Sequence, residues 1–111
     1  MKDFAGNGYL INNAVGQRLY EEYARDMPIF DYHNHLSPQE IYENKSFGDI
    51  TELWLAHDHY KWRAMRAAGV DEYYITGGAP SKEKFIEFAR VTEKLIGCPL
   101  HYWVHFELAR Y

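Results

Sequence analysis

Hydrophobic residues at helical spacing dominate the chain. Val15, Leu19 and Tyr23 recur every four residues after Asn12 or Asn13, either of which can cap a helix, and they predict a helix through about residue 25. Similar stripes follow polar residues further along the chain. They predict helical segments over about 37–44, 49–68, 81–96 and from 99 onward. The expected secondary structure is therefore mostly α-helical.

The predicted helix ends depend on a few capping residues. Ser37 and Glu40 have the spacing of a capping box around Pro38, and Asp49 opens the next segment in the same way. That segment is expected to be helical, with a bend near His57. Ser81 is expected to cap the helix that follows the turn 76–80. The glycines expected to end helices are Gly69 and Gly97.

The run from Pro28 breaks the helical pattern and predicts a short β-strand over 28–35. Side chains alternate across a strand, so His33 and His35 are expected to project from one face at its C-terminal end. Two neutral imidazoles on one face make half of a metal site. Asp31, on the same face, is either a hydrogen-bond partner of these rings or a plain strand-edge carboxylate. Because a lone strand leaves its backbone groups unpaired, the pattern indicates the beginning of a larger protein.

A second polar cluster lies on the predicted helix that follows His57. His59, Arg63 and Arg66 share one helical face, and Tyr60 adds a phenolic donor. Arginine forks and imidazole donors suit a carboxylate ligand. From spacing alone, however, a solvated charged face beside a buried Trp62 is the stronger interpretation.

Composition narrows the class of protein. The 111 residues suffice for one small domain, and the aromatic share of 17% supplies core material. A net charge of −4 argues against nucleic acid as the main partner. No apolar run is long enough to span a membrane, and the first residues lack the apolar stretch of a secretory signal. The single cysteine, Cys98, fits a reducing cytoplasm and a structural role.

The remaining histidines carry weaker signals. His57 and His59 would point about 200° apart on a continuous helix, so they are not expected to form a metal pair unless the helix breaks there. His101 and His105 have a spacing that can bind zinc, but the glutamate that would serve as a base is missing. Both are expected to be packing or surface residues.

Two segments resemble the uronate isomerases, also called glucuronate isomerases, of the amidohydrolase superfamily. Residues 27–38 (MPIFDYHNHLSP) are similar to that family's first barrel strand. Residues 58–66 (DHYKWRAMR) are similar to a more specific family element, and the closing stretch 99–108 is similar to a later helix. The resemblance covers almost the whole chain.

The resemblance implies an α/β fold, a (β/α)8 TIM barrel with a mainly helical insertion after the first strand. Residues 1–36 would supply the first helix and first strand, and 37–111 the helical subdomain. His33 and His35 would bind a divalent metal, usually zinc. His59 and Tyr60 would line the substrate site and act in catalysis, with Arg63 as a further substrate-binding residue. A later aspartate ligand, a histidine and an arginine would lie beyond Tyr111, so the chain alone is expected to be inactive.

The implied reaction interconverts D-glucuronate with D-fructuronate, and D-galacturonate with D-tagaturonate, in the cytoplasm. The partner would be a small hexuronate, and homo-oligomerisation is left open. Two alternatives remain at this point. A metal-dependent hydrolase would use the same histidine pair to hold an activated water, and a non-catalytic helical fragment would be stable only by association.

Overall fold

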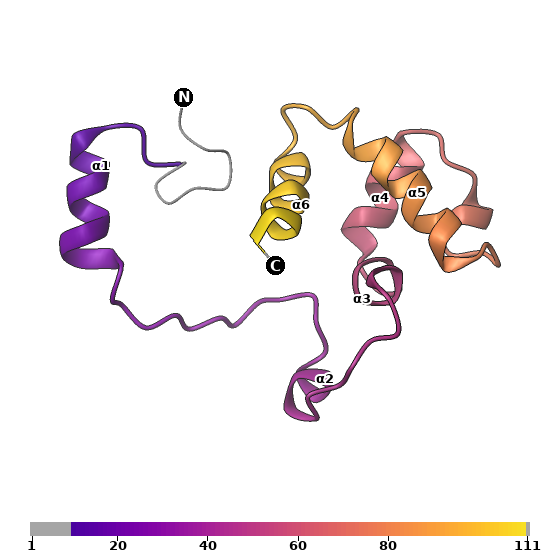
Figure 1. The fold of residues 1–111 in the computed structure, drawn as a ribbon, viewed down its shortest axis with the longest axis horizontal. Coiled ribbons are helices and arrows are strands. Elements are labelled where there is room, and N and C mark those ends of the chain that lie inside the picture. The colour runs from indigo at the N-terminus through magenta and orange to yellow at the C-terminus, as the bar shows by residue number, and fades with distance from the viewer. Residues whose placement is uncertain (1–9, 111) are drawn as a thin grey trace. The chain divides into compact units, whose positions relative to one another are not determined.

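The computed structural model describes residues 10–110, and within that range all regular secondary structure is helical (Figure 1). The chain separates into two compact units. The first contains residues 1–33 and 105–111, and the second contains residues 34–104. The boundary predicted between 36 and 37 stays a prediction about the complete protein.

The first unit contains the predicted N-terminal helix. Helix α1, Ala14–Leu19, begins after Asn13, whose side-chain oxygen accepts a hydrogen bond of 2.8 Å from the Gly16 N–H. The helix continues as a π-helical turn, Tyr20–Ala24. Both the capping asparagine and the extent of the predicted helix are confirmed. The cap works because it satisfies an N–H group that the first helical turn leaves unpaired.

The strand predicted for 28–35 is not formed in this structure. Residues 28–34 have no regular secondary structure, and a bend follows at 35–36. Strand formation requires a neighbouring strand to complete the hydrogen-bond ladder, and residues 10–110 supply none. Ile29, Phe30 and Tyr32 are accordingly 92%, 89% and 90% exposed. The sequence pattern of a buried strand is present without the sheet that would bury it.

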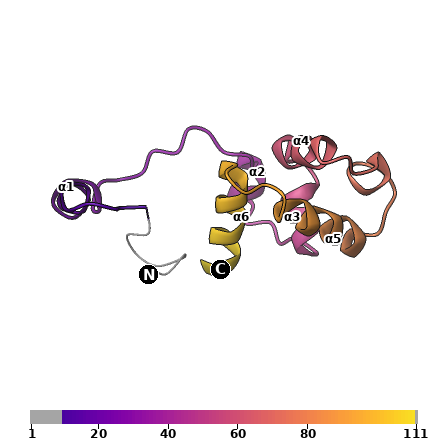
Figure 2. The same cartoon turned by 90° about the horizontal axis from the view of Figure 1, so that it is seen from above.

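The second unit is a helical cluster (Figure 2). After α2, Pro38–Tyr42, come α3, Ile50–Leu55, and α4, His59–Ala67. A 3-10 turn, Glu72–Tyr74, leads to α5, Ser81–Thr92, and α6, Pro99–Arg110, begins in the same unit. Helices α3, α4 and α5 contact one another in all three pairings.

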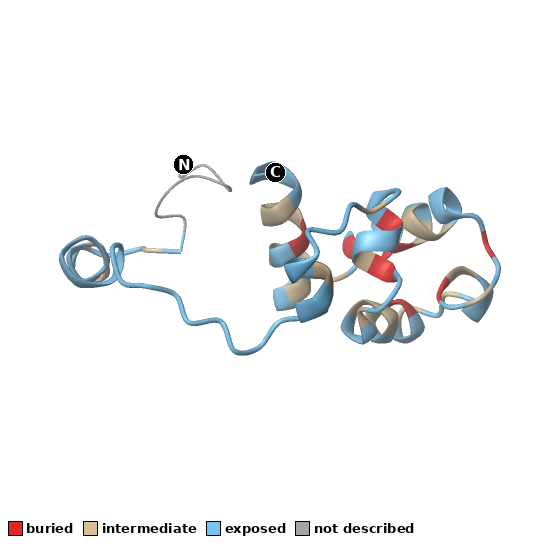
Figure 3. Ribbon diagram, turned by 90° about the horizontal axis from the view of Figure 1, so that it is seen from below, coloured by how far each residue is buried: buried red, intermediate tan, exposed pale blue. Residues whose placement is uncertain are grey.

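The hydrophobic core of the second unit lies among these helices. Figure 3 shows the buried residues gathered there. The core residues are Leu55, Met65, Ile75, Phe88, Val91 and Val104. Trp54, Trp62 and Phe85 pack against them while remaining partly exposed. No helix in the described range is both long and apolar enough to cross a membrane.

Several helix ends differ from the prediction. Asp49 caps α3 as expected, accepting a 2.8 Å hydrogen bond from the Glu52 N–H. The segment 49–68 is nevertheless two helices, because Asp58 provides a second cap and begins α4. Gly69, at φ +81°, follows α4 in the left-handed conformation that glycine adopts without strain.

The two predicted serine caps have different outcomes. Ser37 is the N-cap residue of α2, as predicted, although its side chain makes no capping hydrogen bond. The prediction for Ser81 is wrong, because Ser81 is the first residue of α5 and Pro80 is its N-cap. In both places proline supplies a preset backbone angle at the helix start, which reduces the need for a side-chain cap. Helix α5 also ends at Thr92, before the predicted stop at Gly97.

Candidate functional site

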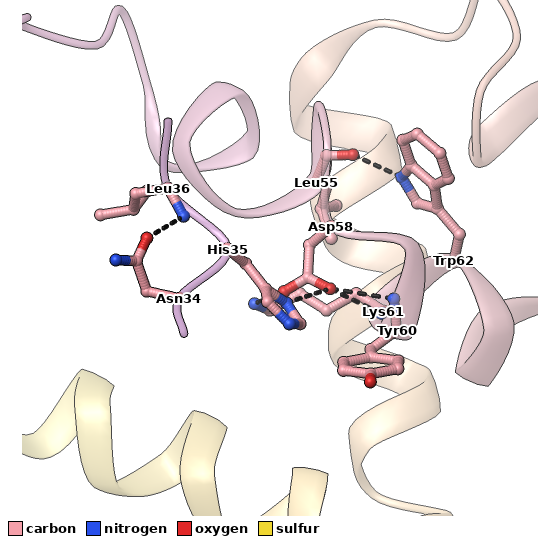
Figure 4. Close-up of polar contacts among 8 residues, drawn as sticks. All are labelled: Asn34, His35, Leu36, Leu55, Asp58, Tyr60, Lys61 and Trp62. Carbon is pink, nitrogen blue, oxygen red and sulfur yellow. Dashed lines mark hydrogen bonds and ion pairs between the residues drawn. The ribbon is translucent and has the colours of Figure 1, made fainter. Parts of the chain in front are cut away.

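Three rings gather at the N-terminus of α4. The His35 ring centroid lies 4.7 Å from that of Tyr60 and 5.5 Å from that of His59. His59 and Tyr60 are themselves 4.6 Å apart. Figure 4 shows His35 and Tyr60 on either side of the Asp58 carboxylate. The end of the predicted histidine segment therefore meets the start of the second polar cluster.

The local sequence explains why His59 and Tyr60 stand at this place. Asp58 is in an extended conformation, and its Oδ1 accepts hydrogen bonds from the backbone N–H groups of Tyr60, at 2.9 Å, and Lys61, at 3.4 Å. This cap starts α4 at His59. On the far side, the Trp62 indole N–H donates to the Leu55 carbonyl at 2.5 Å and ties α4 to the end of α3.

The Asp58 carboxylate also contacts one lysine and one histidine side chain. Lys61 Nζ lies 2.8 Å from Oδ2, and His35 Nδ1 lies 3.3 Å from Oδ1. The side chains of Asp58 and Lys61 are only 14% and 11% exposed. Burial by itself would raise the pKa of Asp58, but the hydrogen bond and charge of Lys61, the Tyr60 N–H and His35 together lower that pKa below its usual value. Asp58 is therefore ionised at neutral pH.

The two histidines of the predicted metal pair, His33 and His35, belong to different units. His35 lies in the second unit, where its Nδ1 is the ring nitrogen that faces Asp58. His33 lies in the first unit, where its backbone N–H donates to Asp31 Oδ1 at 3.1 Å. Within residues 10–110, no group of three His, Cys, Asp or Glu side chains is arranged to hold a metal ion. The shared ligation of one metal by His33 and His35 stays a prediction.

The two arginines of the predicted carboxylate-binding face differ. Arg66 donates to both carboxylate oxygens of Glu72, at 2.8 and 2.5 Å, so its guanidinium already holds a carboxylate from the chain itself. The guanidinium of Arg63 lies 5.3 Å from the Tyr60 ring centroid. Arg63 therefore stays beside the ring cluster, whereas Arg66 serves the contact between α4 and the following turn.

Sequence reasoning missed Asp58 and Lys61. Their i, i+3 spacing at a helix start was a usable signal, because an aspartate cap and a lysine one turn later can pair. The predicted separation of His57 from His59 assumed a continuous helix, and the break at residues 56–58 removes that assumption. His101 is a packing residue as expected: its Nδ1 lies 2.7 Å from the Thr92 carbonyl at the end of α5.

Comparisons with known proteins place the chain in a family. The glucuronate isomerase family model matches residues 1–111. The uronate isomerases of Caldicellulosiruptor saccharolyticus and Bacillus subtilis are 55% and 56% identical to it over 111 residues, which is 100% of this chain and 24% of theirs. The crystal structure of uronate isomerase from Thermotoga maritima superposes with a TM-score of 0.84 at 44% identity, over 98% of this chain and 24% of that one. The chain thus spans about a quarter of the length of the relatives it matches, and it belongs to the glucuronate isomerase family.

Proposed function

We propose that the complete protein carrying this segment interconverts aldose and ketose hexuronates. The pairs are D-glucuronate with D-fructuronate, and D-galacturonate with D-tagaturonate. Family membership supports the reaction class, and the relatives that match are named uronate isomerases. The single observation that carries the site is the cluster of His35, His59 and Tyr60, because it joins the two segments that mark the family.

The chemistry defines what the site must do. In the open-chain sugar, the hydrogen on C2 moves to C1 and the hydroxyl hydrogen on O2 moves to O1, so the product is an isomer of the substrate. An enediol or enediolate lies between the two. A base, an acid and a donor to the developing oxyanion are therefore needed.

The side chains near the N-terminus of α4 can fill these roles. His59 can donate to the uronate carboxylate, and Tyr60 can hydrogen-bond or move a proton near C1 and C2. Arg63, beside the Tyr60 ring, offers a cationic fork to the same carboxylate. In this proposal His59 and Tyr60 are the catalytic pair, and all three residues bind substrate.

His33 and His35 would hold a divalent metal, with zinc as the expected ion. Bound there, the metal would act as a Lewis acid toward the sugar carbonyl and hydroxyl oxygens. The imidazole donor set suits zinc, and His35 has a nitrogen free of the Asp58 contact. Further ligands would come from outside residues 10–110, because no complete ligand set is found within that range.

We further propose that residues 28–35 form the first strand of a (β/α)8 barrel in the complete protein. Three large apolar side chains of this segment, Ile29, Phe30 and Tyr32, are exposed and would gain burial in a barrel wall. The histidines would then lie at the C-terminal end of the strand, where barrel enzymes keep their sites. A cytoplasmic location completes the proposal.

A chimera tests the proposed function directly. Residues 1–111 would replace the matching segment of the Bacillus subtilis uronate isomerase, which is 56% identical over that length. We expect isomerisation of D-glucuronate and D-galacturonate, followed by NMR of the sugar products. Simple esters and amides serve as control substrates and should not be hydrolysed. A soluble, folded chimera that hydrolyses amides and leaves both uronates unchanged would contradict the proposal.

A further inference from the structure

Asp58 lies where the two family segments meet and contacts both of them. One carboxylate oxygen, Oδ1, faces His35 Nδ1 and the backbone N–H of Tyr60. The other, Oδ2, faces Lys61 Nζ. Asp58 thus combines a helix cap, a largely buried ion pair and a histidine contact. The arrangement goes beyond what starting a helix requires.

We propose that Asp58 is a positioning residue for the active site, which sets the tautomer of His35 and the place of Tyr60 through one carboxylate. As acceptor from His35 Nδ1–H, it favours the tautomer in which Nε2 carries the lone pair that a metal ligand would need. As the cap of α4, it fixes the first turn that carries His59 and Tyr60. The first of these roles rests on the proposed function, because it concerns a metal at His35.

Lys61 explains why the carboxylate can serve two neighbours at once. Its ammonium lies 2.8 Å from Asp58 Oδ2 and 5.2 Å from the centroid of the Trp54 ring, and its side chain is largely buried. A half-buried carboxylate needs such a partner to remain charged. Because Lys61 pairs with Oδ2, Oδ1 can interact with both His35 and the backbone N–H groups.

Asp49 provides a matched control on the neighbouring helix. It caps α3 through a 2.8 Å hydrogen bond from the Glu52 N–H, much as Asp58 caps α4. The Glu52 N–H, with smaller contributions from Ser81 and Thr51, lowers the pKa of Asp49, and no histidine contributes to that shift. Replacing either aspartate with serine keeps a side-chain oxygen that can cap the helix. Only the change at residue 58 removes a carboxylate that faces a histidine.

Zinc binding tests the proposal in the chimera described above. Competition with a chelator of known affinity would give the zinc dissociation constant of the parent, of Asp58→Ser and of Asp49→Ser. We expect Asp58→Ser to weaken zinc binding by about tenfold or more, as loss of a partner of a metal-bound histidine does elsewhere. Asp49→Ser should bind zinc as the parent does. Equal zinc affinity in all three proteins would overturn the metal-directed role of Asp58.

A second measurement needs neither the chimera nor the metal. Nitrogen chemical shifts of the His35 ring, in the metal-free 111-residue chain at about pH 8, report which nitrogen carries the proton. We expect the Nδ1–H tautomer in the parent chain and a shift toward Nε2–H in Asp58→Ser. A parent His35 that is mainly Nε2–H overturns the proposal. If the chimera holds no zinc, the metal assignment fails, and the ring tautomer alone then decides the role of Asp58.

Discussion

At the scale of single residues, His59 has the place expected of a substrate-binding group and no contact that the core requires. It stands at the first position of α4, exposed, with its ring beside those of His35 and Tyr60. In the chimera, His59→Asn should lower turnover by about 100-fold, a typical effect of losing one hydrogen-bond donor that acts on the transition state. Zinc content, measured by elemental analysis, should stay that of the parent. Unchanged turnover would remove His59 from the site.

The residue scale also shows what sequence reasoning reaches. Helical spacing grouped Arg63 with His59, the family resemblance gave Arg63 and Tyr60 their site roles, and the ring–guanidinium contact between these two is local. Arg66 was assigned to the same face, yet Glu72 holds it. The pairing of Asp58 with His35 joins residues far apart in sequence, so no spacing rule predicts it. The sequence therefore predicts contacts between neighbouring residues of one helix, but not contacts made by tertiary packing.

At the scale of elements, an ion pair joins α4 to the 3-10 turn that follows. Hydrogen bonds from Arg66 and from the Thr76 hydroxyl, with the arginine charge, lower the pKa of Glu72 to about 2, against a weak opposing effect of burial. The folded pKa lies below the unfolded value of about 4.5, so this contribution to stability is complete above that pH. It is lost as the pH falls from about 4.5 toward 2.

The Glu72→Gln variant checks this pH dependence. Thermal unfolding followed by circular dichroism at several pH values should show a smaller loss of melting temperature between pH 5 and pH 3 than in the parent chain, because Gln does not titrate. Glu93→Gln is the control, since Glu93 is exposed just after α5 and forms no ion pair within the part of the chain that the structure describes. Parallel acid curves for parent and Glu72→Gln would contradict the role given to this pair.

Element boundaries followed from the sequence where their causes are local. The helix after Asn13 and the helix from Pro99 were both predicted, because capping residues and periodic apolar positions lie within the segment itself. The break between α3 and α4 was predicted only as a bend, since Asp58 was not identified as a cap. The predicted strand at 28–35 is not formed, for the opposite reason: its backbone hydrogen bonds need partner strands from outside the described range.

At the scale of the whole molecule, the second unit has a core of its own. All six core residues, from Leu55 to Val104, belong to residues 34–104. Phe88 is 1% exposed at the centre of α5, where it contacts the edge of the Trp54 ring. A core this small has few residues to share the loss of one large side chain. The stability of the unit should therefore depend strongly on Phe88.

The Phe88→Ala variant tests that dependence. Removing the ring loses buried apolar surface and leaves a cavity, at a cost of about 3–5 kcal/mol, which is a large part of the stability of a small domain. Ile86→Ala is the matched control, because Ile86 lies on the same helix with 40% of its surface exposed and should cost far less. Urea unfolding followed by Trp fluorescence would measure both changes, since Trp54 and Trp62 pack against the core. Equal destabilisation by the two variants would mean that the second unit is not organised around the core described above.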